Sequence, residues 1–547
     1  MKNSFNITTG IIAGFFIIIY FSFVYYFTIN IPLTDDYSVI QGFLLKFEQS
    51  SSLKEKFALL FSQFEEHRIF FAKSIILSVH ACSGVINYSA LIFIGNLLII
   101  GLGFFMLLTA KNNKIISLYI LILVLIFYNG QNFETSTWAM VGLANVGVLF
   151  IAMTSMYCML NTKHNLFYLG LILSVITIFS NGNGMFIIPP IAIGLYLQNR
   201  KKNMLVFLCI TLVFVFLYFC DFKTGRISIE PIDLIKNLHI LFRNFLFFIG
   251  LNFWIPSYKF ISFSVGLFCI SVYLFGIWKK WYKNNLLIYA YLTFYFLSAA
   301  AVAITWLNTE ISGALRYRLY CSPTIILTLF LVLNNIKTPK LKYIVSLSLC
   351  FSLFSLSSTY IYAHKEQKKM EWKKKSAYNW HNKGARLAAF SSNEDYGLHE
   401  IEKSGWYQMP KYPLSDYASS VSREKVHTYS ETEKISYKIE DVAENGKYIS
   451  IEGWGFLENK SMNFNRIYVC LINNEQAYIA STFSERRYDL NLEIPLDRIE
   501  NCGFFAVIDK ERIPEGTYQV AIRIKNMFGF GSIHDKITGE SIIIKYS

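Results

Sequence analysis

A pair of adjacent carboxylates stands just after the first apolar run of this chain. Asp35 and Asp36 follow residues 10–29, which are long and apolar enough to span the hydrocarbon of a bilayer. A charge at the centre of a membrane helix costs at least about 2.5–3.5 kcal/mol, so charged groups beside a span are usually functional. We therefore expect Asp35 or Asp36 to be a general base for a hydroxyl group, with Tyr37 contacting the substrate. The alternative is that the pair caps an interfacial turn after Pro32.

A second charged cluster lies in an aromatic stretch about thirty residues further on. Glu66, His67 and Arg68 combine a carboxylate, an imidazole and a guanidinium group. The spacing of residues 53–80 predicts a helix along the membrane surface, with Glu66 and His67 on one face as groups that assist the base. Glu65 and Arg68, three residues apart, would pair on another face. The alternative for this pair is a surface ion pair without a role.

Later segments add candidate binding groups. Arg316 and Arg318 precede an apolar run, and the guanidinium fork fits phosphate oxygens, so we expect both to hold a phosphate. Snorkelling to the membrane interface is the alternative. Glu134 and Trp138 offer a carboxylate and an aromatic platform to a sugar, although a lone tryptophan is also typical of an interfacial belt. Asn181, in a turn of Asn and Gly residues, is a further substrate-binding candidate.

The composition of the whole chain is that of a polytopic membrane protein. Of its 547 residues, 54% are hydrophobic, 17% aromatic and only 16% charged, and the mean hydropathy is +0.37. The net charge of +14 would suggest nucleic-acid binding in a soluble protein, but here the basic residues cluster between apolar runs, so we expect no nucleic-acid partner. The cysteines lack metal-binding spacing, and only Cys470 and Cys502, in the polar tail, could form a bridge.

Eleven apolar runs are predicted to span a membrane. They are residues 10–29, 85–110, 115–128, 141–160, 166–180, 185–198, 204–220, 260–278, 286–305, 321–335 and 342–363. Every second connection is basic, which predicts a cytoplasmic N-terminus, and an odd number of spans then places the C-terminus outside. One basic flank, residues 364–375, opposes this topology. All candidate side chains fall on the extracytoplasmic side.

The composition divides the chain into three parts. Residues 1–363 hold the spans, with a first extracytoplasmic loop over residues 30–84, and residues 364–429 form a partly helical linker. Residues 430–547 alternate short β-branched and aromatic runs with Asn, Gly and Pro, which predicts an all-β sandwich. The expected fold is therefore an α-helical polytopic membrane domain followed by an extracytoplasmic β domain.

The first span, the Asp-Asp-Tyr opening of the loop and its Glu-His-Arg element together resemble the GT-C superfamily of glycosyltransferases, which use polyprenyl-phosphate-linked sugars. Within that superfamily, the chain is most similar to the bacterial type-specific glucosyltransferases that modify O-antigen. The resemblance covers roughly residues 1–365. It implies catalytic roles for the acidic pair and for the adjoining Glu and His. Arg68, Arg316 and Arg318 would then hold the phosphate of the donor.

The resemblance also implies a reaction and a set of partners. A sugar, glucose or another hexose, would move from undecaprenyl phosphate to a cell-surface glycan such as O-antigen, with inversion, outside a bacterial inner membrane. One base suffices for this displacement, and the phosphate leaving group needs positive charge. A divalent metal could take part, and a flippase and a polyprenyl-phosphate glycosyltransferase would supply the donor. Two alternatives stay open: a polymerase or ligase acting on undecaprenyl-linked glycans, and a transporter or flippase, which mid-membrane charges would favour.

Overall fold

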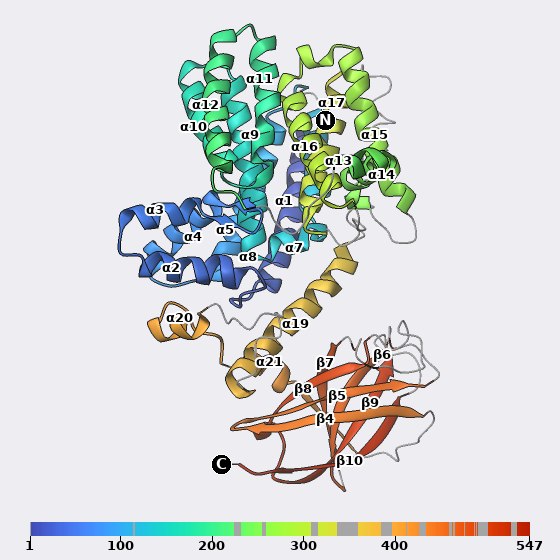
Figure 1. Ribbon diagram of the computed structural model, residues 1–547. Helices are drawn as coiled ribbons and strands as arrows, with labels where there is room; N and C mark the ends of the chain where they lie inside the picture. The colour runs from blue at the N-terminus through green and yellow to red at the C-terminus, as the bar shows by residue number, and fades with distance from the viewer. Residues whose placement is uncertain are drawn as a thin grey trace. The chain divides into compact units, whose positions relative to one another are not determined.

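The chain forms two compact units (Figure 1). The computed structural model describes residues 2–112, 115–223, 231–253, 259–307, 315–335, 350, 359–383, 397–411, 413–425, 434–458, 462, 465–474, 476–485, 487, 490, 501–526 and 533–546. A helical unit comprises residues 1–366 and 394–408, and a β-rich unit comprises residues 367–393 and 409–547. The predicted linker over residues 364–429 is therefore not a part of its own, because its segments belong to both units.

Helices of very different length build the helical unit. They are α1 Lys2–Phe27, α2 Phe43–Gln49, α3 Leu53–Phe61, α4 Phe70–Ser83, α5 Tyr88–Leu107, α6 Ile116–Phe127, α7 Phe133–Ser136, α8 Ala139–Val141, α9 Gly147–Leu160, α10 His164–Ile178, α11 Ile188–Leu197, α12 Lys201–Phe219, α13 Pro231–Lys236, α14 Leu238–Ile249, α15 Lys259–Trp278, α16 Leu286–Thr305, α17 Arg318–Asn335 and α20 Leu398–Ser404. Short helical turns join them, among them η1 Tyr37–Gly42, η4 Gly142–Val146, η5 Gly182–Ile187 and η10 Leu315–Tyr317. Helix α19 (Thr359–Lys383) begins in this unit and ends in the other.

Seven helices among the described residues are long and apolar enough to cross a membrane. They are Thr9–Phe27, Tyr88–Leu107, Ile116–Ser136, Ala139–Leu160, Lys201–Phe219, Lys259–Trp278 and Leu286–Thr305, and each overlaps one predicted span. The predicted spans 166–180 and 185–198 are shorter apolar helices, and 321–335 lies within α17. Most of the predicted span 342–363 lies outside the described residues. The count of eleven therefore stays a prediction.

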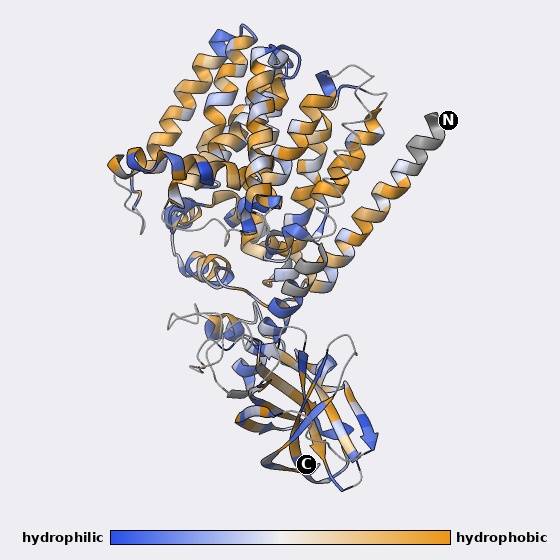
Figure 2. Cartoon of the chain, turned by 90° about the vertical axis from the view of Figure 1, so that its right-hand side faces the viewer, coloured by the Kyte–Doolittle hydropathy of each residue, from blue (hydrophilic) through white to orange (hydrophobic). Residues whose placement is uncertain are grey.

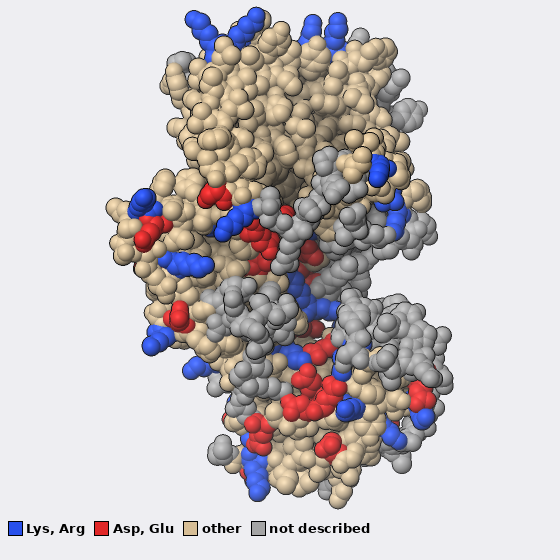
Figure 3. Space-filling model, viewed as in Figure 1, with Lys and Arg blue, Asp and Glu red and all other residues tan. Residues whose placement is uncertain are grey.

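The long helices of the helical unit consist mostly of hydrophobic residues (Figure 2). On α12 the exposed side chains include Leu212, Val213 and Phe216. A helix that is apolar all round is typical of a membrane span, whereas a soluble protein rarely leaves so large an apolar face in water. Figure 3 shows the corresponding belt without Lys, Arg, Asp or Glu, with Lys and Arg gathered at one end of the helical unit.

Hydrogen bonds join the basic connections between the helices at this end of the helical unit. The guanidinium group of Arg200, before α12, donates to the carbonyl of Asn161, after α9, at 2.8 Å. The backbone N–H of Lys111, after α5, donates to the side-chain oxygen of Asn334, near the end of α17, at 3.2 Å. These bonds join connections that the sequence predicts to lie on one side of the membrane.

A late segment returns to cover the first loop. The backbone N–H of Ile86 donates to the carbonyl of Trp406 at 2.7 Å, and the hydroxyl of Tyr407 donates to the carbonyl of Asn30 at 2.8 Å. The ring of Trp406 also packs edge-on against His80, with ring centroids 5.0 Å apart. Residues 397–408 are therefore part of the helical unit, although more than three hundred residues of chain separate them from the loop they cover.

The β-rich unit holds an antiparallel sheet of eight strands. They are β3 Val421–Lys425, β4 Ile435–Asn445, β5 Tyr448–Leu457, β6 Asn465–Ile472, β7 Gln476–Glu485, β8 Gly503–Asp509, β9 Gly516–Asn526 and β10 His534–Ile544. Their order is β10-β9-β6-β7-β8-β5-β4, and β3 pairs with β7. Residues 477–481 of β7 pair with β6 and residues 482–485 pair with β8, so β7 belongs to both halves of the sheet. The all-β prediction is confirmed, but the sheet is continuous and barrel-like rather than a sandwich of two separate sheets.

Apolar side chains from both halves of the sheet form the core of the β-rich unit. Ile451, Phe504 and Ile522 are among its fully buried residues. Cys470 and Cys502 are buried free thiols, so the bridge that the sequence allowed is not formed.

Candidate catalytic site

The two adjacent carboxylates after α1 have different surroundings. Asp36 is 1% exposed, and its two side-chain oxygens accept hydrogen bonds from the backbone N–H groups of Leu33, at 2.9 Å, and Met140, at 2.8 Å. These bonds close the turn after α1 and tie it to α8. Because both oxygens of Asp36 already bind backbone amides, a substrate could reach them only by breaking this anchor. The geometry thus supports the turn-capping alternative for Asp36.

Asp35, in contrast, is half-buried and lies among other charged side chains. Loss of hydration raises the pKa of its carboxyl group, and the negative charge of Glu65 raises it further, while the positive charge of Arg316 opposes the rise. A carboxylate with a raised pKa accepts a proton more readily at neutral pH. Asp35 therefore has the surroundings expected of a general base.

His67 and Arg316 belong to the same cluster. Loss of hydration lowers the pKa of His67, Glu66 and Glu65 oppose that change, and Arg316 lowers the pKa further. Solvent nevertheless reaches the side chain of His67. His67 is thus solvent-exposed although neighbouring protein atoms lower its pKa. Figure 3 shows acidic side chains gathered around a recess just below the uncharged belt of the helical unit.

A short hairpin presents His67. Strand β1 (Gln63–Phe64) pairs with β2 (His67–Arg68), and Glu65 in the turn has a left-handed φ of 46°. The predicted helix over residues 53–80 is therefore wrong in its middle part. Helix α3 ends before the hairpin and α4 begins after it, since a left-handed residue cannot continue a right-handed helix.

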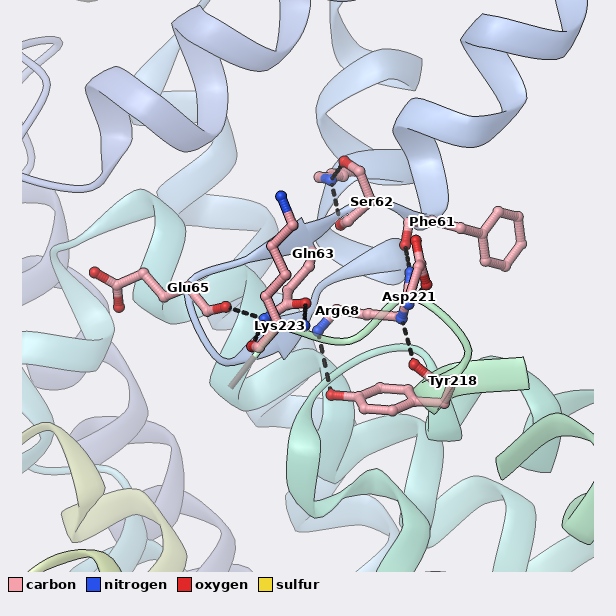
Figure 4. A network of polar contacts seen from close by, with 9 residues as sticks. Phe61, Ser62, Gln63, Glu65, Arg68, Tyr218, Asp221 and Lys223 are labelled. Atoms are coloured by element: carbon pink, nitrogen blue, oxygen red, sulfur yellow. Dashed lines mark hydrogen bonds and ion pairs between the residues drawn. The ribbon is translucent and has the colours of Figure 1, made fainter. Parts of the chain in front are cut away.

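Arg68 anchors this hairpin to the end of α12 (Figure 4). Its side chain is 4% exposed; Nε donates to the carbonyl of Tyr218 at 3.0 Å, Nη1 donates to the carbonyl of Phe61, and Nη2 pairs with Asp221. All three guanidinium nitrogens are thus bonded within the protein. The predicted pair between Glu65 and Arg68 is not formed, and the contacts of Arg68 favour a positioning role over phosphate binding.

The side chains of Gln63 and Lys73 form further hydrogen bonds around the hairpin. The side chain of Gln63 donates to the carbonyl of Lys223 at 2.7 Å and accepts from its backbone N–H at 3.0 Å. The buried ammonium group of Lys73 donates to the carbonyls of Leu59 and Ser62 at 2.9 and 2.8 Å, and to the hydroxyl of Ser62 at 2.7 Å. A cation beside the last carbonyls of α3 is favourable, because the C-terminal end of a helix carries partial negative charge. Loss of hydration lowers the pKa of Lys73 to about 8.

The turn of Asn and Gly residues before α11 packs against His67. A Cβ atom at Gly182 would lie 2.9 Å from Nδ1 of His67, so glycine allows the imidazole to approach the backbone. Asn181 shapes this turn: its side-chain oxygen accepts from the N–H of Gly182 at 2.7 Å, and its amide donates to Asn145 at 3.3 Å. Asn181 therefore positions the wall of the site.

Asn183, two residues further on, presents its side-chain amide to other polar groups. This amide donates to the hydroxyls of Ser298 and Tyr320 at 3.3 and 3.5 Å. Asn183 is not among the predicted site residues, although its place between two glycines in the same turn was a signal for it.

The remaining predicted residues divide into accessible and buried ones. Glu134 and Trp138 are half-buried and flank Thr135, whose hydroxyl donates to the carbonyl of Arg316 at 3.1 Å. Tyr37 is 2% exposed and Arg318 is 1% exposed. Neither side chain is therefore open to solvent in this conformation. The predictions that Tyr37 contacts the substrate and that Arg318 holds a phosphate stay predictions. The burial of Arg318 contradicts the snorkelling alternative.

No group of three or more His, Cys, Asp and Glu side chains that could hold a metal ion occurs among the described residues. Comparison of the chain with models of protein families, with curated proteins and with solved structures gave no match.

Proposed function

We propose that this chain is a membrane glycosyltransferase that moves a sugar from a polyprenyl-phosphate donor to a glycan acceptor. The main support is the environment of Asp35, a half-buried carboxylate with a raised pKa beside Glu65, with Arg316 near enough to counter the rise. Asp35 and Glu65 belong to the loop that follows the first long apolar helix, and Arg316 comes from η10. A donor that is half lipid and half sugar phosphate needs such a boundary between an apolar and a charged environment.

In the proposed reaction, Asp35 removes the proton of an acceptor hydroxyl group. The hydroxyl oxygen attacks the anomeric carbon of the sugar, and the bond between that carbon and the phosphate oxygen breaks. The electron pair leaves with the polyprenyl phosphate, whose negative charge the guanidinium group of Arg316 stabilises. Attack opposite the leaving group inverts the anomeric centre. The proton stays on Asp35 until solvent removes it.

His67 and Asn183 are proposed to bind the sugar. The lowered pKa keeps His67 neutral at neutral pH, so that its ring can donate one hydrogen bond and accept another without adding charge beside Asp35. The NH2 group of Asn183 already donates to Ser298 and Tyr320, whereas its buried side-chain oxygen has no hydrogen-bond partner among the described residues and could accept from a sugar hydroxyl group that enters the site. Glu66, which is half-buried next to His67, is proposed to assist it.

The test uses the purified full chain in lipid nanodiscs with undecaprenyl phosphate carrying a radiolabelled hexose and a surface glycan as acceptor. We expect labelled glycan and free undecaprenyl phosphate in equal amounts, and almost none from Asp35→Asn. Elongation only of glycans linked to undecaprenyl diphosphate would favour a polymerase or ligase instead. Transfer of the intact lipid-linked sugar between leaflets without cleavage would contradict the proposal and favour a flippase.

A further inference from the structure

A cavity of about 620 Å³ lies at the end of the helical unit far from Asp35, among the ends of α5, α9, α11 and α16. Helix α5 separates the two places. The N–H of Tyr88, its first residue, donates to the side chain of Asn30 in the first loop, whereas Lys111 in the cavity wall follows its last turn. A helix of 20 residues is about 30 Å long. The cavity is therefore not part of the candidate catalytic site.

Two lysines line this cavity. Lys111 and Lys283 line it together with the polar side chains of Asn161 and Asn284, while leucines such as Leu108 form its apolar wall. Within the described part of the chain, no carboxylate lines the cavity, and neither ammonium group has a hydrogen bond or an ion pair. Loss of hydration lowers the pKa of Lys111. The wall thus offers positive charge that the described protein does not neutralise.

A network of amides fixes the floor of the cavity. Asn334 donates to the side-chain oxygen of Asn285 at 2.9 Å and to the carbonyl of Thr109 at 3.0 Å, and it accepts from the hydroxyl of Tyr119 at 2.6 Å. Thr109 and Asn285 both line the cavity. These partly buried hydrogen bonds satisfy one another, so they give the floor of the cavity a defined shape.

Exposed aromatic side chains beside lysines indicate where this end of the helical unit lies relative to the membrane. The ammonium group of Lys279 lies 4.0 Å from the ring centroid of the exposed Trp278, and that of Lys201 lies 6.0 Å from the exposed Tyr196. Exposed Trp and Tyr beside basic residues are typical of the membrane–water interface. A ligand in this cavity would therefore sit at the level of lipid headgroups.

We infer that this cavity binds a phosphate-bearing ligand, with the phosphate between Lys111 and Lys283 and the apolar part along the leucines. An anionic phospholipid of the adjacent leaflet supplies both features, and a soluble phosphate compound supplies only the first. Basic pockets between membrane helices bind anionic lipid headgroups in this way. The site is independent of the proposed glycosyltransferase reaction.

The test compares lipid binding by the full chain and by K111Q/K283Q, in detergent, by native mass spectrometry with added phosphatidylglycerol. Both lysines are exposed, so the substitutions leave the fold intact. Each lysine near an anionic lipid is worth about 1 kcal/mol, which is about fivefold in affinity, so the double variant should bind roughly 25-fold more weakly. The matched control is K201Q/K279Q, which removes the same charge at the same end but outside the cavity wall, and it should keep the wild-type affinity.

Two further probes identify the source of the phosphate. If millimolar inorganic phosphate displaces phosphatidylglycerol from the wild type, the site takes phosphate from soluble compounds as well, and if it does not, the site is specific for lipid. Phosphatidylcholine should not compete, because its headgroup has no net charge. Equal lipid binding by K111Q/K283Q and K201Q/K279Q, or equal binding of both lipids by the wild type, would overturn the inference.

Discussion

Two regions of the first loop use charged side chains in opposite ways. At the hairpin and the turn after α1, the charged groups of Arg68 and Asp36 are buried and bonded to the protein on all sides, which stabilises the loop. Around Asp35 and His67, charged groups are desolvated but remain open to solvent. The two neighbouring carboxylates thus have different surroundings, because backbone N–H groups bind Asp36, whereas mainly charged side chains surround Asp35. The comparison predicts that substitutions in the first region change stability and those in the second change the reaction.

The largest expected effect is on the rate of Asp35→Asn. Asparagine keeps the shape of the side chain but cannot accept a proton, and general-base catalysis is worth roughly 10²–10⁴-fold. We expect kcat for sugar transfer to fall by that factor, measured with purified protein at saturating donor. The melting temperature at neutral pH should be unchanged or higher, because the raised pKa means that the folded protein disfavours the ionised form of Asp35.

Asp36→Asn should show the reverse pattern. Its amide has one acceptor oxygen, so one of the hydrogen bonds from the backbone N–H groups of Leu33 and Met140 is lost. The backbone N–H group that loses its acceptor then faces the NH2 group of the asparagine. Leaving a buried group unsatisfied costs about 1–3 kcal/mol. We expect a lower melting temperature and a normal rate per folded molecule. Loss of turnover by Asp36→Asn without loss of stability, together with an active Asp35→Asn, would exchange the two roles.

The sequence alone could not separate these two residues. Long apolar runs and short β-branched runs are strong local signals, and they predicted the seven long helices and most strands of the β-rich unit. Strand β7 carries a weaker local signal, because Ala477, Ala480 and Ser481 interrupt its β-branched and aromatic pattern. The partners that determine the role of a charge are distant in sequence. Met140 lies 104 residues after Asp36, and Asp221 lies 153 residues after Arg68.

The hairpin was missed for a different reason. The helical periodicity of the sequence continues through the charged cluster, but the backbone becomes extended at Ser62 and left-handed at Glu65. That conformation is uncommon for glutamate, so its residue type carried no signal. Anchors from Tyr218 and Lys223 hold the hairpin, and both follow it by about 150 residues. Local sequence rules therefore fail where long-range bonds determine the backbone.

Arg316 and Arg68 differ in the same way as Asp35 and Asp36, and we expect a smaller effect on the reaction. Arg316 is half-buried and interacts with both Asp35 and His67, whereas Arg68 is fully bonded within the protein. If Arg316 binds the donor phosphate, loss of a charged hydrogen bond of about 1.5–3 kcal/mol in Arg316→Ala should raise the KM for the donor roughly 10–100-fold. Excess donor should restore part of the rate. Arg68→Ala is the matched control: it should lower the melting temperature, and excess donor should not rescue it.

The smallest expected effect is on the pH dependence of the reaction. The base works only when ionised, so kcat/KM should rise with pH through the pKa of Asp35, which lies above the ordinary value of an aspartate. Because the negative charge of Glu65 contributes to that rise, Glu65→Gln should lower the pKa and move the acid limb of the profile to lower pH. Arg316→Ala removes a positive charge that opposes the rise, so the acid limb should move to higher pH. Shifts of the two variants in the same direction would show that Glu65 and Arg316 do not act on Asp35 through their charges.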